Sequence, residues 1–150
     1  MGTSNSGSRT STREAEERRR REAEAYARQQ RINQINAEIR VLNGEKSSLE
    51  GIVNSLKGYK NQLDTMVNSW RELFSKDMAN TVLIKDNVYE GNHAENTTRA
   101  FSEAINKMKD NVQSVDRVKG DVGGQISILE KRISNIGTQL SELYGELYSI

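Results

Sequence analysis

The chain has 150 residues, of which 34% are hydrophobic and 29% charged, with a formal net charge of +1, one His, no Cys and no Pro. The lack of Cys excludes a disulfide scaffold, a thiolate zinc site and a cysteine nucleophile, and one His cannot supply the ligands of a transition-metal site. A chain of this length is expected to form one domain, and without Pro nothing need interrupt a long helix.

The amino-terminal segment, residues 1–12, consists mostly of Gly, Ser, Thr and Asn. Such a composition has too little to bury, and we expect a disordered tail. No apolar run approaches the roughly 18–20 residues that cross a bilayer, and the amino-terminal segment lacks the apolar middle of a secretory signal. We therefore expect a cytoplasmic protein, or one exported by a route without a cleaved leader.

Residues 13–31 are rich in helix formers, with Glu and Arg at the i,i+4 spacing of a helix. They predict a charged helical arm. Residues 1–31 hold eight Arg and five Glu and so carry +3, which leaves −2 on the rest of the chain. The run Arg18–Arg21 leaves nucleic-acid or membrane-surface binding open as an alternative. The interleaved Glu residues favour a solvated arm, and we expect no nucleic-acid partner.

The strongest pattern is a seam of apolar residues that recur at alternating steps of three and four. The first seam is apolar at eleven of its thirteen positions: Ile32, Ile35, Ile39, Leu42, Lys46, Leu49, Val53, Leu56, Lys60, Leu63, Val67, Trp70 and Phe74. The second is apolar at fourteen of its fifteen positions: Phe101, Ile105, Met108, Val112, Val115, Lys119, Val122, Ile126, Leu129, Ile133, Ile136, Leu140, Leu143, Leu147 and Ile150. Stepping that persists this long is typical of one helix packed against another.

Two seams on either side of one break predict an all-α fold, a long antiparallel helical hairpin of coiled-coil type over residues 32–150. Helix one is expected at about 28–80, the turn at about 81–92 and helix two at about 93–150. The break contains residues that favour a reversal of the chain, namely Asp86, Asn87, Gly91 and Asn92.

The position of the turn also predicts which residues face each other. A hairpin centred near residue 87 places residue i roughly opposite residue 174 − i. Phe74 is then expected opposite Ala100, and Leu42 opposite Arg132.

Small residues recur on the face of helix one that points away from the seam. If Ile32 is heptad position a, then Gly44, Gly51 and Gly58 all occupy position f. Glycine inside an exposed helix costs about 0.5–1 kcal/mol relative to Ala. Two explanations stay open: a closely packed partner helix, or a hinge, since Gly51 is expected level with Gly123.

Position g of helix one is apolar in the half near the turn. These residues are Ile52, Tyr59, Met66 and Leu73. A two-helix hairpin cannot cover so wide an apolar stripe, which a third or fourth helix normally covers. We predict that these four residues and the three f-position glycines bind a helical partner or a second copy of the chain.

Aromatic residues are expected in the seam core near the turn, at Trp70, Phe74 and Phe101, with an exposed recognition anchor as the alternative for Trp70. His93 is expected in the turn or the first turn of helix two. No nucleophile, base and orienting group can be assembled around a single His with scattered acids. The sequence therefore predicts no enzymatic activity, no cofactor, no metal site and no small-molecule substrate.

The turn reads Tyr89-Glu90-Gly91, followed by Ala94 and Phe101 at the start of helix two. A helical hairpin with an aromatic-x-Gly turn resembles the Trp-x-Gly, or ESAT-like, superfamily of type VII secretion in Gram-positive bacteria, with Tyr89 in place of the Trp. Within it, residues 32–150 are similar to the YwqH-like small helical proteins encoded beside LXG polymorphic toxins.

The resemblance implies a non-enzymatic adaptor or chaperone that binds the helical N-terminal domain of an LXG-type toxin and presents it for type VII secretion. Its partners would be that larger helical protein and a second small helical protein. The alternative is a structural coiled coil, such as a phage or scaffold component, that self-associates as a homo-oligomer.

Overall fold

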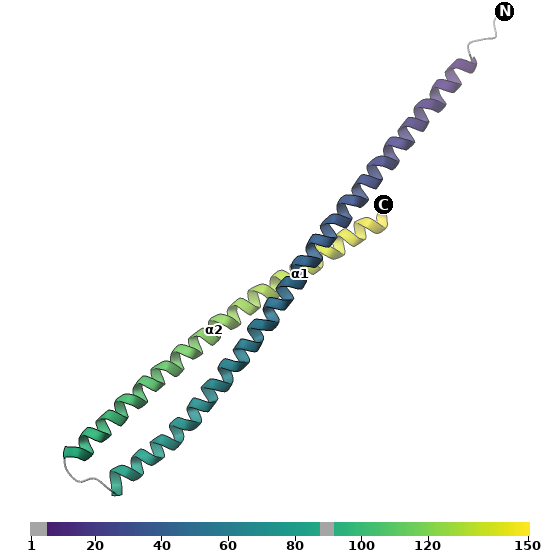
Figure 1. The fold of residues 1–150 in the computed structure, drawn as a ribbon. Coiled ribbons are helices and arrows are strands. Elements are labelled where there is room, and N and C mark those ends of the chain that lie inside the picture. Colours follow the sequence, from purple (N-terminus) through teal and green to yellow (C-terminus); the bar gives the residue numbers. More distant parts are fainter. Residues whose placement is uncertain (1–5, 88–91) are drawn as a thin grey trace, which may run out of the picture. The chain divides into compact units, whose positions relative to one another are not determined.

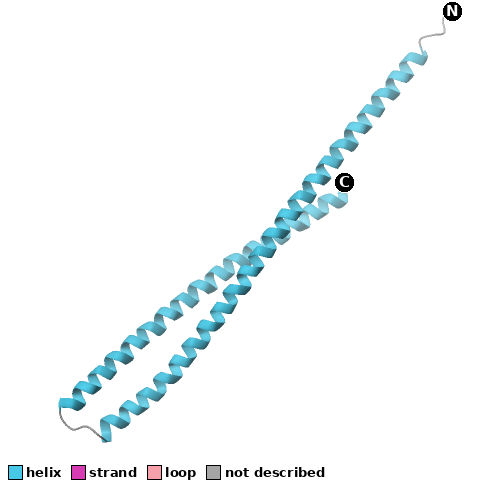
Figure 2. Ribbon diagram, viewed as in Figure 1, coloured by secondary structure: helices cyan, strands magenta, loops and turns pink. Residues whose placement is uncertain are grey.

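The structure, a computed structural model, describes the backbone of residues 6–87 and 92–150 and the side chains of residues 9–76, 96 and 99–150. It contains helix α1, Ser6–Asn87, and helix α2, Asn92–Ser149 (Figures 1 and 2). Apart from Ile150, every residue whose backbone is described is helical. The predicted all-α helical hairpin is confirmed.

Helix α1 is longer than expected at both ends. It includes residues 6–12, for which the composition predicts a disordered tail, and it continues through residues 81–87, where the turn is expected. Neither segment contains Pro. A lapse in the apolar stepping removes contacts between helices but not the hydrogen bonds within one helix, so it does not end α1.

The chain divides into two compact units. Unit 1 comprises Met1–Ser48 and Ile133–Ile150, and unit 2 comprises Leu49–Arg132. Each unit contains a stretch of α1 packed against an antiparallel stretch of α2 and has its own core. The buried hydrophobic side chains are Ile35, Ile39, Ile136 and Leu140 in unit 1, and Val53, Val67, Val112 and Ile126 in unit 2.

The seam stepping predicts burial closely. All thirteen positions of the first seam are buried or partly buried, and so are all positions of the second except Phe101 and Ile150. The Lys residues at positions 46, 60 and 119 are partly buried like their apolar neighbours. A Lys side chain can cover apolar surface with its aliphatic stem while its ammonium group stays in water, so a Lys is compatible with a partly buried position.

The expected register is wrong by about one heptad. Phe74 and Met108 line the same hollow in unit 2, and Leu42 and Leu143 line the same groove in unit 1. For two residues that face each other, the residue numbers are expected to add up to about 174. For Phe74 and Met108 they add up to 182. The physical reason is that α1 continues to Asn87, which moves the reversal toward the carboxyl terminus.

Truncation of a core side chain tests the seam. Ile35 is 0% exposed, and we expect Ile35→Ala to lower the free energy of unfolding by about 2–5 kcal/mol, because the cavity is left among packed side chains. Val41 on the same helix is 69% exposed, and Val41→Ala should change stability by less than about 0.5 kcal/mol. Urea unfolding followed by circular dichroism measures both, and equal effects would contradict the assigned core.

Candidate functional site

One edge of the seam in unit 2 carries ion pairs between the helices. Lys57 Nζ lies 2.8 Å from Glu130 Oε1, and Arg71 Nη2 lies 3.4 Å from Asp116 Oδ2. All four residues occupy heptad position e of their seams, and e lies opposite e when two helices pack antiparallel. These side chains are substantially exposed, so we assign the pairs to alignment of the helices more than to net stability.

This edge also carries a charged side chain whose residue belongs to the seam. Lys119 occupies a seam position, and its Nζ donates a hydrogen bond of 2.6 Å to Asp64 Oδ1. This hydrogen bond raises the pKa of Lys119 above its ordinary value, against an opposing effect of desolvation. The cation is thereby accommodated beside an apolar core.

The opposite edge of unit 2 is apolar. It carries the g positions of α1, which we call the apolar row: Ile52, Tyr59, Met66 and Leu73 are between 45% and 60% exposed. Val118 occupies position g of α2, level with Tyr59 in the observed register, and is 51% exposed. The structure therefore places the four predicted g residues together on one exposed edge and adds a fifth apolar side chain from α2.

The corresponding edge of unit 1 is charged. Arg31 donates two hydrogen bonds to Glu146, from Nε to Oε1 at 2.6 Å and from Nη2 to Oε2 at 2.7 Å. This bidentate contact lowers the pKa of Glu146 and raises that of Arg31, although desolvation acts in the opposite direction on each. Position g thus carries ions in unit 1 and apolar side chains in unit 2.

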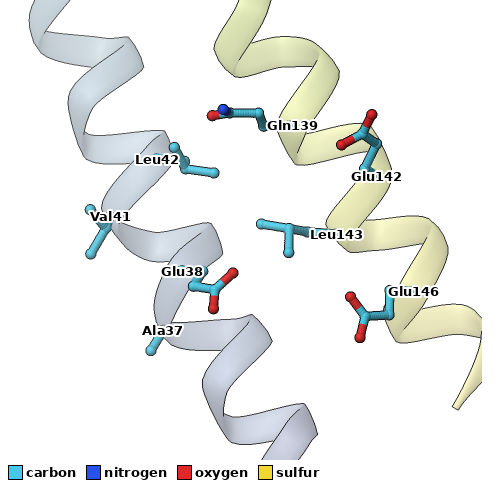
Figure 3. A pocket seen from close by; sticks show the side chains of 8 residues that line it. All are labelled: Ala37, Glu38, Val41, Leu42, Gln139, Glu142, Leu143 and Glu146. Atoms are coloured by element: carbon cyan, nitrogen blue, oxygen red, sulfur yellow. The ribbon is translucent and has the colours of Figure 1, made fainter.

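An acid-rimmed groove of about 610 Å³ lies on this edge of unit 1 (Figure 3). Leu42 of α1 and Leu143 of α2 point toward one another, and the carboxylates of Glu38 and Glu146 point into the space between the helices. The remaining lining residues are Ala37, Val41, Gln139 and Glu142. Sequence reasoning missed this groove, because its depth depends on which side chains face each other.

The f-position glycines lie on an open face. A Cβ added at Gly44, Gly51 or Gly58 would meet no atom within 4 Å. In α2, by contrast, a Cβ at Gly123 would lie 3.4 Å from Lys60 Nζ. Gly123 is thus level with Lys60 and not with Gly51. The expectation that Gly51 and Gly123 lie side by side, which supported a hinge, is therefore wrong.

The aromatic residues near the turn differ in burial. Trp70 and Phe74 are partly buried and line a hollow of about 220 Å³ with Met108 and Asn111. Phe101 is 39% exposed. The predicted turn motif, Tyr89 and Gly91, and the side chain of His93 lie outside the described residues.

The described residues carry three exposed features and no recognisable metal or membrane-spanning site. Within residues 9–76 and 99–150, no group of three or more His, Asp and Glu side chains is arranged to hold a metal ion. Neither helix, as far as it is described, contains a stretch that is long and apolar enough to cross a membrane. What the geometry provides is an apolar edge in unit 2, an acid-rimmed groove in unit 1 and an open glycine face.

In comparisons with known proteins, no family model, curated protein or solved structure matches this chain.

The Arg31–Glu146 pair makes stability depend on pH at the acid side. Because folding lowers the pKa of Glu146, its contribution is present at neutral pH and is lost as the pH falls through the folded-state value, which lies below the ordinary 4.5. Glu146→Gln should lower the Tm at pH 7 and have a smaller effect at pH 3. Glu142→Gln, in the same groove, is the control, and an equal loss of Tm for both variants at pH 7 would contradict the role of the pair.

The open glycine face predicts stabilisation by Ala. The triple variant Gly44→Ala, Gly51→Ala and Gly58→Ala should raise the free energy of unfolding by about 1.5–3 kcal/mol, since the added methyl groups meet nothing and Ala restricts the unfolded chain. At Gly123 the added methyl group would make an ordinary van der Waals contact with Lys60 Nζ at 3.4 Å, so Gly123→Ala should gain about as much as one of the three sites. Urea unfolding measures both, and destabilisation by the triple variant would show that this face is not open.

Proposed function

We propose that this chain is a non-enzymatic helical adaptor that binds the helical N-terminal domain of an LXG-type toxin and keeps it competent for type VII secretion. The observation that carries the proposal is the apolar row, with Val118 beside it, on one edge of unit 2. Five large apolar side chains that are 45–60% exposed remain available for burial by another helix. The toxin class comes from the resemblance of the seams and the turn to the YwqH-like proteins.

The geometry of unit 2 fits a helical partner. The apolar row recurs every seven residues along α1, which is the spacing at which a further helix can lay its own side chains into the gaps. The opposite edge already carries ion pairs within the hairpin, at Lys57–Glu130 and Arg71–Asp116. A partner hairpin laid on the apolar edge would complete a bundle of four helices.

The test is affinity capture of the tagged chain from its source cells at near-physiological salt, with mass spectrometry of the captured proteins. We expect one larger protein with a long helical N-terminal region. The double variant Tyr59→Asp and Met66→Asp should reduce its recovery by about tenfold or more, because two apolar side chains no longer contribute their burial.

The matched control is Asn54→Asp and Asn68→Asp, which adds the same charge at exposed positions of the same helix outside the apolar row. It should leave capture unchanged. Recovery of the chain alone, as a discrete oligomer, would reject the adaptor proposal and favour a self-associating structural coiled coil.

A further inference from the structure

We infer that two copies of this chain associate through the exposed amino-terminal part of α1, which docks on the acid-rimmed groove of the other copy. We call residues 9–30 the exposed arm, because every side chain in this range is exposed. The inference concerns unit 1 and does not depend on the proposed function, whose surface lies in unit 2.

The apolar seam does not continue into the exposed arm. Stepping backward from Ile32, the seam positions are Arg28, Ala25, Arg21 and Arg18, so the apolar pattern ends at the arm. Ion pairs within the arm, Glu17–Arg21 at 3.6 Å and Arg20–Glu24 at 3.0 Å, support it only locally. Pairs of this kind contribute about 0.2–0.5 kcal/mol each, which leaves a solvated helix of this length marginal.

Charge complementarity identifies the occupant of the groove. The exposed arm holds seven Arg and five Glu and carries +2, whereas residues 31–48 together with 133–150 hold four Glu, two Arg and one Lys and carry −1. Residues 49–132 hold twelve basic and twelve acidic side chains and are neutral. The chain therefore separates its charge between the arm and the paired helices of the same unit.

The groove offers both chemical features that such an arm requires. Leu42, Leu143 and Val41 provide apolar contact, and Glu38 and Glu142 provide carboxylates on the rim in addition to Glu146, which Arg31 holds. The arm presents Arg18–Arg21 for the carboxylates, and Tyr26, 68% exposed, for the apolar lining. A partly desolvated Arg–carboxylate contact is stronger than the same contact in open water.

The arm cannot reach the groove of its own chain, because α1 is helical without interruption from Ser6 to Asn87. In a second copy related by a two-fold axis, each arm can dock on the other's groove, which closes the assembly at two chains. The lengths agree: at 1.5 Å per residue the arm spans about 33 Å, and the 18-residue stretch 133–150 about 27 Å.

The test is sedimentation equilibrium of the purified full chain from low to high micromolar concentration, at low and high NaCl. We expect a monomer–dimer equilibrium whose dissociation constant rises with salt. Two variants test the contact. The arm variant replaces Arg18, Arg19, Arg20 and Arg21 with Glu, and the groove variant combines Glu38→Arg with Glu142→Arg. Each should weaken dimerisation by about tenfold or more.

Mixing the two variants provides a decisive check. The acidic arm of one then meets the basic groove of the other, and the basic arm meets the acidic groove, so an equimolar mixture should dimerise again. This recovery also shows that both variants are folded. The control replaces Lys107, Lys109, Arg117 and Lys131 with Glu, the same change of charge at exposed positions of unit 2, and should dimerise like the wild type.

A chain that remains monomeric at all concentrations and salts would overturn the inference, as would a dimer that the arm variant leaves intact. A dimer that is sensitive to the arm variant but not to the groove variant would also overturn the inference, because the arm would then dock elsewhere. Binding of the monomeric wild type to duplex DNA or to phosphatidylserine vesicles, lost in the arm variant, would instead make the arm a polyanion-binding segment and also reject the inference.

Discussion

A hairpin of two helices has one line of contact, and this constraint governs the rest of the molecule. Eight of the described hydrophobic side chains are buried, and only Ile35 and Val67 are fully buried. Because few side chains are buried, stability depends on a seam that is one side chain deep. The edges of this seam carry the ion pairs and the apolar row. The ionic edge of unit 2 aligns the helices, and the apolar edge leaves large side chains exposed.

The alignment of the two helices needs more than the apolar seam. A seam that repeats every seven residues buries nearly the same side chains after a slip of one heptad, so it leaves the register poorly specified. The groups at its edges break this degeneracy, because Arg31 with Glu146, Arg71 with Asp116 and Lys119 with Asp64 are brought together in one register. Lys119 is the most selective of these, since any shift would move a partly buried cation away from its carboxylate.

What could be predicted from the sequence differs between the apolar seam and the register of the two helices. Seam membership could be predicted, because helix packing translates directly into steps of three and four. The register could not be read from the apolar residues, since the lapse at residues 81–87 breaks the stepping without breaking the helix. Matching charges at e and g positions, for instance Lys57 with Glu130, would have found it. The exposure of Ile52, Tyr59, Met66 and Leu73 follows from the heptad, whereas the groove at Leu42 and Leu143 depends on the register and was therefore missed.

The wide sequence separation of the Arg31–Glu146 contact also bears on the order of folding. These residues are 115 positions apart, whereas Arg71 and Asp116 are 45 apart. Closing a longer loop costs more entropy, so contacts in unit 2 can form first and shorten the effective loop that unit 1 must close. During synthesis, the α1 stretch of unit 1 leaves the ribosome early but has nothing to pack against until residues 133–150 emerge. The groove is consequently among the last features of the molecule to exist.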